Sequence, residues 1–187
     1  MKMFVCAMFV ALTLSPSPNA QASIARAISF EQKIDDAEMI VLGRCVERHS
    51  AYDPSGRWIL TYTTFEVEKS YKGVPGTRIT IVTPGGVVGS RHQETLGVPR
   101  FGEGDVNILF LKRSGAGPTV LFFDQGVYRV VSDEASGERV VAPVRSDLVL
   151  IDTQTGRVKS ASDEGAQSLS AFERQLRERL ERERSSR

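Results

Sequence analysis

The pattern of apolar and polar positions predicts that this chain is mainly β. Strands are predicted at 39–46, 58–67, 78–83, 106–111, 120–123, 127–131, 148–151 and 157–159. The first of these (MIVLGRCV) and the fourth (VNILFL) are almost uninterrupted apolar runs, typical of strands buried on both faces. Turn-forming residues separate the runs, as in DPSG at 53–56 and DTQTG at 152–156. Many short strands with regular turns predict a closed β-barrel or a sandwich.

Two of the predicted strands carry more detailed signals. Gly43 interrupts the strand at 39–46 and is expected to allow a bulge or a close backbone approach. In the strand at 58–67 one face carries Ile59, Thr61, Thr63, Phe65 and Val67, and the other carries Trp58, Leu60 and Tyr62. Both faces begin apolar, so this strand is expected to be long, bent and covered on both sides there.

Short helices are predicted near the two ends of the domain. Ser29 and Gln32 form a capping box that begins a helix over 29–37. Ser170 and Glu173 form a second possible capping box, before an apolar stripe made of Phe172, Leu176 and Leu180. This stripe predicts a C-terminal amphipathic helix that docks on the domain and frays beyond its last apolar residue. Three apolar residues are too few heptads for a coiled coil.

The first 22 residues have the anatomy of a secretory signal peptide. Lys2 precedes the apolar run MFVCAMFVALTL, two prolines break that run, and the AQA sequence at 20–22 is a cleavage site of the A-x-A type. The run is shorter than the roughly 20 apolar residues that span a bilayer. The predicted organisation is therefore a signal peptide at 1–22, a β-barrel domain at 23–165 and a C-terminal helix with a charged tail at 166–187, secreted or periplasmic, with no membrane span after cleavage.

Charge and cysteine content narrow the functional classes. The whole chain has a formal net charge of +1, and Lys2 leaves with the predicted signal peptide. A neutral chain lacks the basic surface that nucleic-acid binding needs, so no nucleic-acid partner is expected. Cys6 also leaves with the signal peptide, so that Cys45 is the one cysteine of the predicted mature chain. It lies within an apolar strand and is expected to be a buried small hydrophobe.

The segment at 84–105 (PGGVVGSRHQETLGVPRFGEGD) is the strongest candidate for a functional surface. It has about twenty residues without a strand or helix pattern, against a usual connection of about 4–6. Its apolar residues predict that it packs, and Phe101 is expected to lie beneath it. Arg91, His92 and Glu94 cluster near its middle and are the candidate binding residues for a small anion or a peptide. The alternative is an ordered loop that only closes one end of the barrel.

Known catalytic and cofactor motifs are missing from the sequence. The glycines at 85 and 86 are not followed by Gly-Lys-Ser or Gly-Lys-Thr, so no nucleotide cofactor is expected. His49 and His92 are the two histidines, and neither has the ligand spacing of a metal site. Serine-nucleophile signatures are absent as well. The chain is therefore expected to bind no cofactor or metal, and the sequence favours a non-enzymatic role without deciding it.

Four sequence segments together resemble a group of uncharacterised secreted bacterial proteins. They are AEMIVLG at 37–43, VEKSYKG at 67–73, ITI at 79–81 with the following PGG, and GVPRFGEGD at 97–105 before VNILFL. The resemblance covers about 28–131 and implies secretion without implying an activity. At the level of fold it implies a small closed OB-like β-barrel, the architecture of netrin-like domains and tissue inhibitors of metalloproteinases.

Three functions remain open from the sequence. The first is a secreted non-enzymatic binding module that presents the 84–105 loop to a protein or peptide. The second is a protease inhibitor that acts by surface occlusion. The inhibitors named above chelate zinc through an N-terminal cysteine, whereas the predicted mature chain here begins at Ser23. The third is a hydrolase with an unrecognised site around Arg91, His92 and Glu94.

We predict cleavage after Ala22, because the A-x-A sequence directly follows the prolines that end the apolar run. Intact-mass measurement of the exported protein should give a chain that begins at Ser23. Recovery of the full-length chain from membranes alone would contradict both the cleavage and the secreted state.

Overall fold

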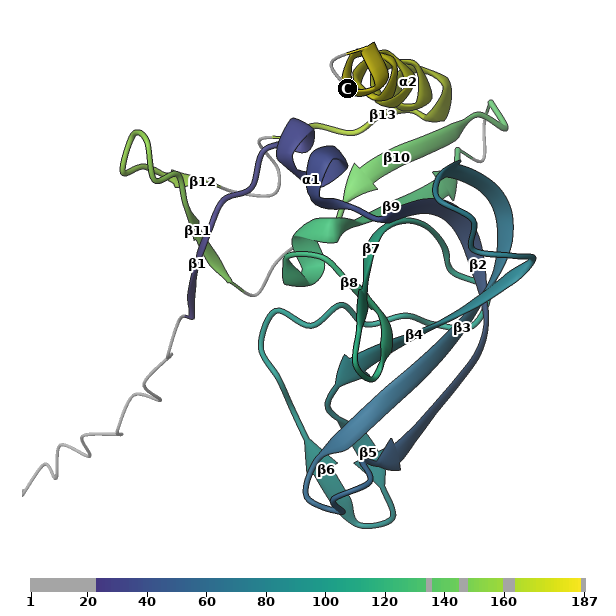
Figure 1. Ribbon diagram of the computed structural model, residues 1–187, viewed down its shortest axis with the longest axis vertical. Coiled ribbons are helices and arrows are strands. Elements are labelled where there is room, and N and C mark those ends of the chain that lie inside the picture. The colour runs from purple at the N-terminus through teal and green to yellow at the C-terminus, as the bar shows by residue number, and fades with distance from the viewer. Residues whose placement is uncertain (1–22, 134–135, 145–147, 160–163, 186–187) are drawn as a thin grey trace, which may run out of the picture.

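The computed structural model describes residues 23–133, 136–144, 148–159 and 164–185. Strands make up 49% of it and two α-helices are present in this described part, which confirms a mainly β fold (Figure 1). The predicted signal peptide at 1–22 lies outside the described residues. Within the described ranges, neither α-helix has the length and apolar content needed to cross a membrane.

One eight-stranded sheet forms most of the molecule. Its spatial order is β13 (Gln167–Ser168), β10 (Arg139–Pro143), β9 (Val127–Ser132), β7 (Val106–Ser114), β2 (Met39–Tyr52), β3 (Ile59–Lys72) and β4 (Arg78–Pro84), with β8 (Gly117–Val120) paired to β7 off this path. The ladders within this sheet are antiparallel. Two smaller sheets join β1 (Ile24–Arg26), β11 (Val149–Ile151) and β12 (Val158–Lys159), and β5 (Gly86–Val88) and β6 (Arg91–Gln93).

The expected closed barrel is not supported. Strands β4, β3, β2, β7 and β8 curve round a common interior, but no backbone ladder closes any sheet within the described residues. The two strand edges that a closed barrel would pair are β4 and β8. Between them, the Thr119 hydroxyl of β8 donates to the Val82 carbonyl of β4 over 2.9 Å. β8 is only four residues long, and the chain leaves it in a left-handed conformation at Phe122 (φ 54°). A side chain therefore bridges the two edges where a ladder would be needed.

Two hydrophobic cores lie on opposite faces of this curved sheet. The helix-side core contains Ile34, Ala37, Ile40, Leu42, Ile108, Phe110, Leu121, Tyr128, Val130, Val141, Phe172 and Leu176. The inner core, on the concave face, contains Met39, Val41, Cys45, Phe65, Ile79, Ile81, Phe101, Leu109, Leu111, Val120 and Val127. Successive residues of β2 and β7 alternate between the two cores, which confirms that the runs at 39–46 and 106–111 are buried on both faces.

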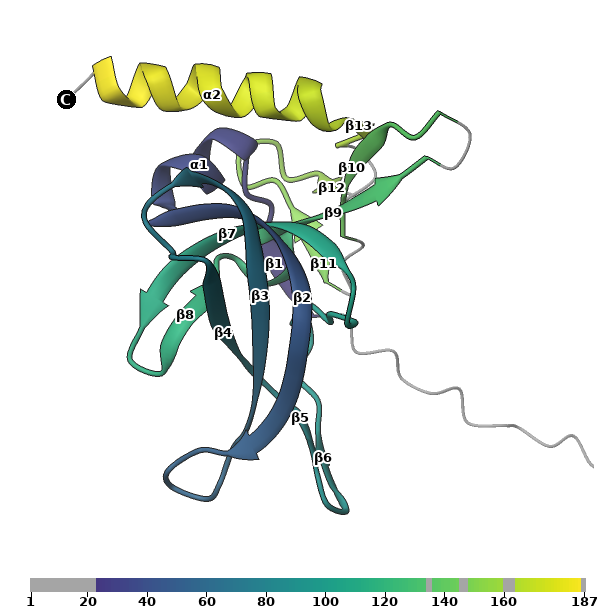
Figure 2. The same ribbon diagram turned by 90° about the vertical axis from the view of Figure 1, so that its right-hand side faces the viewer.

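The two helices cover one face and lie at one end of the molecule (Figure 2). In α1 (Phe30–Asp36) the Ser29 hydroxyl accepts from the Gln32 backbone N–H at 3.2 Å, which confirms the predicted N-cap. The capping box predicted at Ser170 is wrong. α2 (Leu169–Ser185) begins earlier, and the Ser168 hydroxyl accepts from the Ala171 N–H at 3.2 Å. The helix also continues past Leu180 instead of fraying there.

Polar contacts fix α2 to the sheet beside its apolar stripe. Glu173 accepts from Tyr71 at 2.6 Å and from Lys69 at 2.9 Å. Lys72 forms an ion pair with Glu183 at 3.1 Å and also donates to the Ile34 carbonyl at 2.8 Å. Burial raises the pKa of the Tyr71 phenol, and its bond to the Glu173 carboxylate raises it further. Tyr71 therefore stays protonated and remains a donor to α2.

One further strand prediction is corrected by the structure, and one is confirmed. The strand predicted at 120–123 ends at Val120, because Phe122 and Phe123 both have positive φ and the chain enters a 3₁₀ helix, η1 (Phe123–Gly126). Gly126 is the last residue of that helix. Gly43, by contrast, lies at a register shift between β2 and β3, and a Cβ there would lie 3.1 Å from the Glu66 carbonyl oxygen. This confirms the predicted bulge and close approach.

We predict that Leu176→Ala lowers the free energy of unfolding by about 2–5 kcal/mol, the usual range for a fully buried leucine. Leu176 is inaccessible to solvent in the helix-side core. Its neighbour Gln175 is exposed, so Gln175→Ala should stay within about 0.5 kcal/mol of the unsubstituted protein. Denaturant unfolding measures both, and equal small effects would show that α2 is not docked.

Candidate functional site

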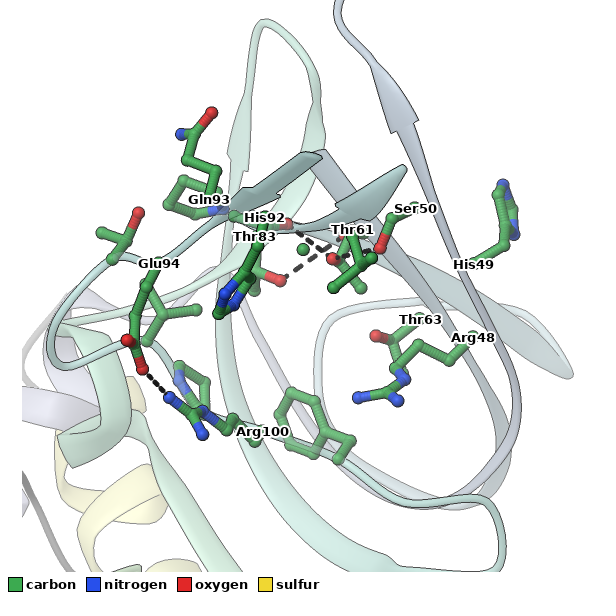
Figure 3. A pocket seen from close by; sticks show the side chains of 18 residues that line it. Arg48, His49, Ser50, Thr61, Thr63, Thr83, His92, Gln93, Glu94 and Arg100 are labelled. Carbon is green, nitrogen blue, oxygen red and sulfur yellow. Dashed lines mark hydrogen bonds and ion pairs between the residues drawn. The ribbon is translucent and has the colours of Figure 1, made fainter. Parts of the chain in front are cut away.

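A hollow of about 420 Å³ opens at the end of the inner core, beneath the 84–105 loop. Figure 3 shows it between the outer parts of β2 and β3 and the chain that follows β4. Phe101 is 4% exposed and packs edge-on against Phe65, with ring centroids 5.1 Å apart, where the inner core meets the hollow. This confirms that Phe101 lies under the loop. The volume is in the range of small-molecule and peptide side-chain pockets.

The 84–105 loop is more regular than the sequence predicted. It contains the hairpin of β5 and β6, which the absence of a strand pattern concealed. Three bonds join this hairpin and the residue before it to β3. Thr61 donates to the Gly85 carbonyl at 2.6 Å, the Gly85 N–H donates to the Ile59 carbonyl at 2.8 Å, and the Gln93 side-chain oxygen accepts from the Ile59 N–H at 3.0 Å. Gly86 has φ 137°, and a Cβ there would overlap the hydroxyl groups of Ser50 and Thr61. Glycine is therefore needed for the hairpin to lie this close.

Threonine side chains line the inner wall of the hollow. Thr61, Thr63 and Thr83 belong to facing positions of β3 and β4 that continue the inward-facing side of Phe65 and Ile81. Thr61 also shares a hydrogen bond with Ser50 at 2.9 Å. Because these positions hold hydroxyl groups instead of hydrophobic side chains, the inner core gives way to a polar surface here.

Thr63 is the exception among these hydroxyl groups. It is only 1% exposed, yet its Oγ1 has no hydrogen-bond partner among the described residues. A buried hydroxyl without a partner costs about 1–3 kcal/mol. Figure 3 shows Thr63 directed toward the hollow. The fold therefore tolerates an unfavourable group at this point of the pocket wall.

The basic side chains that line the hollow are Arg48, His49, His92 and Arg100 (Figure 3). Arg48 lies directly across the β2–β3 ladder from Thr63, and within the described part of the chain its guanidinium has no ion pair or hydrogen bond. Arg100 is neutralised by an ion pair with Glu94. His92, from β6, is exposed and points into the same space. The positive charge of Arg48 is thus left uncompensated.

The predicted binding residues divide between two places. His92 and Glu94 line the hollow, and Glu94 is engaged by Arg100. Arg91 is exposed at the start of β6 and does not line the hollow. The structure therefore brings together two of the three residues and leaves Arg91 on the outer surface of the hairpin.

Sequence reasoning missed Arg48, Ser50, Thr63 and Arg100 as site residues. Arg48 and Ser50 come from β2, far from the loop in sequence, and only the β2–β3 register places them opposite Thr63 and Thr61. One signal was present. Two threonines occupy the face of the 58–67 strand that also carries Ile59 and Phe65, and polar residues on an inward face mark a place where the core stops.

The site has no arrangement typical of a hydrolase within the described residues. Ser50 and Thr61 bond to each other, Thr61 also donates to the Gly85 carbonyl, and neither has a hydrogen bond to His92. Cys45 is 1% exposed, as expected, and burial followed by the charge of Asp105 raises the pKa of its thiol. It is therefore protonated and out of reach. No group of three His, Cys, Asp or Glu side chains in the described ranges is placed to hold a metal ion.

Comparison with protein-family models, with curated proteins and with solved structures found no match for this chain. The function must accordingly be argued from the geometry of the hollow and the residues around it.

We predict that Thr63→Val raises the free energy of unfolding by about 1 kcal/mol, because it removes a buried hydroxyl that has no partner. Thr61→Val is the matched control one position along the same face. It removes the donor to the Gly85 carbonyl and should lower stability by about 1 kcal/mol. Chemical denaturation of both variants checks the pair. A loss of stability in Thr63→Val equal to that in Thr61→Val would show that the Thr63 hydroxyl is structurally satisfied.

Proposed function

We propose that this protein is a secreted, non-enzymatic binding module that takes a protein or peptide partner outside the cytoplasm. The 84–105 loop and the hollow beneath it form the binding surface. The observation that carries the proposal is an open hollow of about 420 Å³ with an unpaired guanidinium and a buried, unpartnered hydroxyl in its wall. The Arg48 guanidinium is exposed and solvated, whereas the Thr63 hydroxyl is left without a partner among the described residues at a folding cost. Such a buried group is expected where a ligand supplies its partner.

Exposed apolar side chains near the hollow support a macromolecular partner. Trp58 is 58% exposed and Tyr52 is 38% exposed at the β2–β3 turn, and Val87 is 58% exposed on β5. Figure 2 places the β2–β3 turn and the β5–β6 hairpin together at the end of the molecule opposite α2. Tryptophan and tyrosine are the residues most enriched among those that dominate binding energy in protein interfaces.

The incompletely closed, OB-like strand arrangement is part of the same proposal. It supplies a rigid wall, because β2 and β3 are fourteen residues long and paired along their length. The β5–β6 hairpin is attached to this wall by the hydrogen bonds from Thr61 to the Gly85 carbonyl and from the Ile59 N–H to the Gln93 side chain. A preorganised surface loses less conformational entropy when it binds, which favours affinity.

Binding is better supported than hydrolysis. A hydrolytic site needs a nucleophile within reach of a base, and His92 has no hydrogen bond to a hydroxyl among the described residues. Protease inhibition by occlusion is a special case of protein binding. It is distinguished by the identity of the captured partner and by loss of that partner's activity.

We predict that the triple variant Arg91→Ala, His92→Ala and Glu94→Ala loses partner capture at least about tenfold, the change in affinity that corresponds to about 1.4 kcal/mol. Its thermal midpoint should hardly change, since all three residues are exposed and the Glu94–Arg100 ion pair is a surface pair. Capture from the extracellular fraction of the secreting cell, quantified beside the unsubstituted protein, measures the effect.

A matched control carries Lys112→Ala, Arg113→Ala and Glu181→Ala. These residues are also exposed and charged but lie on β7 and α2, outside the hollow. This control should capture the partner normally. Equal capture by both triple variants removes the loop from the binding surface, whereas unfolding of the first variant would show that the loop has a structural role.

A further inference from the structure

We propose that the hollow binds a carboxylate group of the partner, with Arg48 as its charged anchor and Thr63 and His92 as hydrogen-bond donors. This inference rests on the proposed function and names the chemical group that the binding surface takes. The observation that leads to it is the placement of Arg48 and Thr63 directly opposite each other at the wall of one hollow, both without partners among the described residues.

The hydrogen-bond donors that remain available in the hollow determine the sign of the charge that its ligand carries. A guanidinium has only donors, and the Thr63 hydroxyl, which makes no hydrogen bond within the described residues, is free to donate its proton. Ser50, Thr61 and Thr83 add hydroxyl groups to the wall, but their bonds are already made within the fold. The groups that remain available therefore present N–H and O–H donors to the hollow, and an oxyanion is the ligand that accepts from all of them.

The charge balance favours a singly charged group over a phosphate. Arg48 contributes one positive charge without an ion-pair partner among the described residues, whereas Arg100 is paired with Glu94. The Glu94–Arg100 ion pair at the same rim adds no net charge that would hold a dianion. Carboxylate also matches the planar fork of an arginine, which makes two parallel N–H bonds to it.

Exclusion of water strengthens the hydrogen bonds between the inner end of the hollow and a bound carboxylate. Thr63 is 1% exposed, and Phe101 beside it is 4% exposed, so the inner end of the hollow is screened from bulk water. A hydrogen bond to a charged group is worth more than a neutral one, and more still where the surroundings are apolar. The Thr63 hydroxyl, which destabilises the free protein, would gain its missing partner in the complex.

The test is a titration of the isotope-labelled exported protein, followed through its backbone amide resonances. The probes are N-acetylglycine, which carries a terminal carboxylate, N-acetylglutamate α-amide, which carries a side-chain carboxylate, the neutral N-acetylglycinamide and inorganic phosphate. Both carboxylates should shift the amides near Arg48 and Thr63 saturably, and the neutral amide should not. Tighter binding of one carboxylate identifies a chain terminus or an acidic side chain as the source, and either result supports the inference.

Two variants make the assignment specific. Arg48→Gln should weaken carboxylate binding at least about tenfold, since it removes the charge and keeps a donor. Thr63→Val should weaken it about fivefold while leaving the protein folded. Arg113→Gln, on β7 and outside the hollow, should bind as the unsubstituted protein does. Binding that is unchanged in Arg48→Gln, equal binding of the neutral amide, or tighter binding of inorganic phosphate would each overturn the inference.

The inference and the proposed function fail separately. If no carboxylate probe binds while the Arg91, His92 and Glu94 variant still loses partner capture, the carboxylate assignment is wrong and the binding surface stands. If carboxylates bind through Arg48 while that triple variant captures its partner normally, the assignment of the hollow is supported and the loop is not the partner's docking surface.

Discussion

β2 is buried on both faces along its first half, and the layers of the molecule are arranged about that half. Ile40 and Leu42 pack toward the helices, and Val41 and Cys45 pack toward the inner core. A strand covered on both faces needs a partner on each edge as well, because its backbone groups have no access to water. β3 and β7 supply those partners, so the position of β2 determines where both cores and both helices can lie.

The second half of β2 is under a different constraint. Its pairing with β7 ends at Arg44, and a register shift between Cys45 and Glu47 follows. Beyond this bulge β2 continues with β3 alone, and the inner core loses its apolar lining. Bulges bend strands and redirect side chains, and they are frequent beside functional sites. The hollow beneath the 84–105 loop therefore lies where β2 no longer pairs with β7 and pairs with β3 alone.

The helices that stabilise the fold and the hollow that we propose as the binding surface lie at opposite ends of the molecule (Figure 2). The helix end gains its stability from Phe172 and Leu176 and from polar contacts such as Tyr71 with Glu173. The other end keeps an unpartnered hydroxyl at Thr63. A protein can retain such a group when the rest of the fold supplies enough stability, and it then serves as a donor that is already in place for a ligand. The two ends can accordingly be altered independently by substitution.

Local chemistry in the sequence determined the elements: the apolar runs of β2 and β7, the Ser29 cap, the turn at 152–156, the burial of Cys45 and the docking stripe of α2. Each follows from interactions between residues near one another in the chain or from the period of one element. The tertiary structure alone decided what depends on distant pairing. The β2–β3 register put Arg48 opposite Thr63, contact with Ser50 and Thr61 held the β5–β6 hairpin on the sheet, and the short β8 left the barrel unclosed. These features could not be predicted because a shift of one residue in register would turn the same side chains to the opposite face.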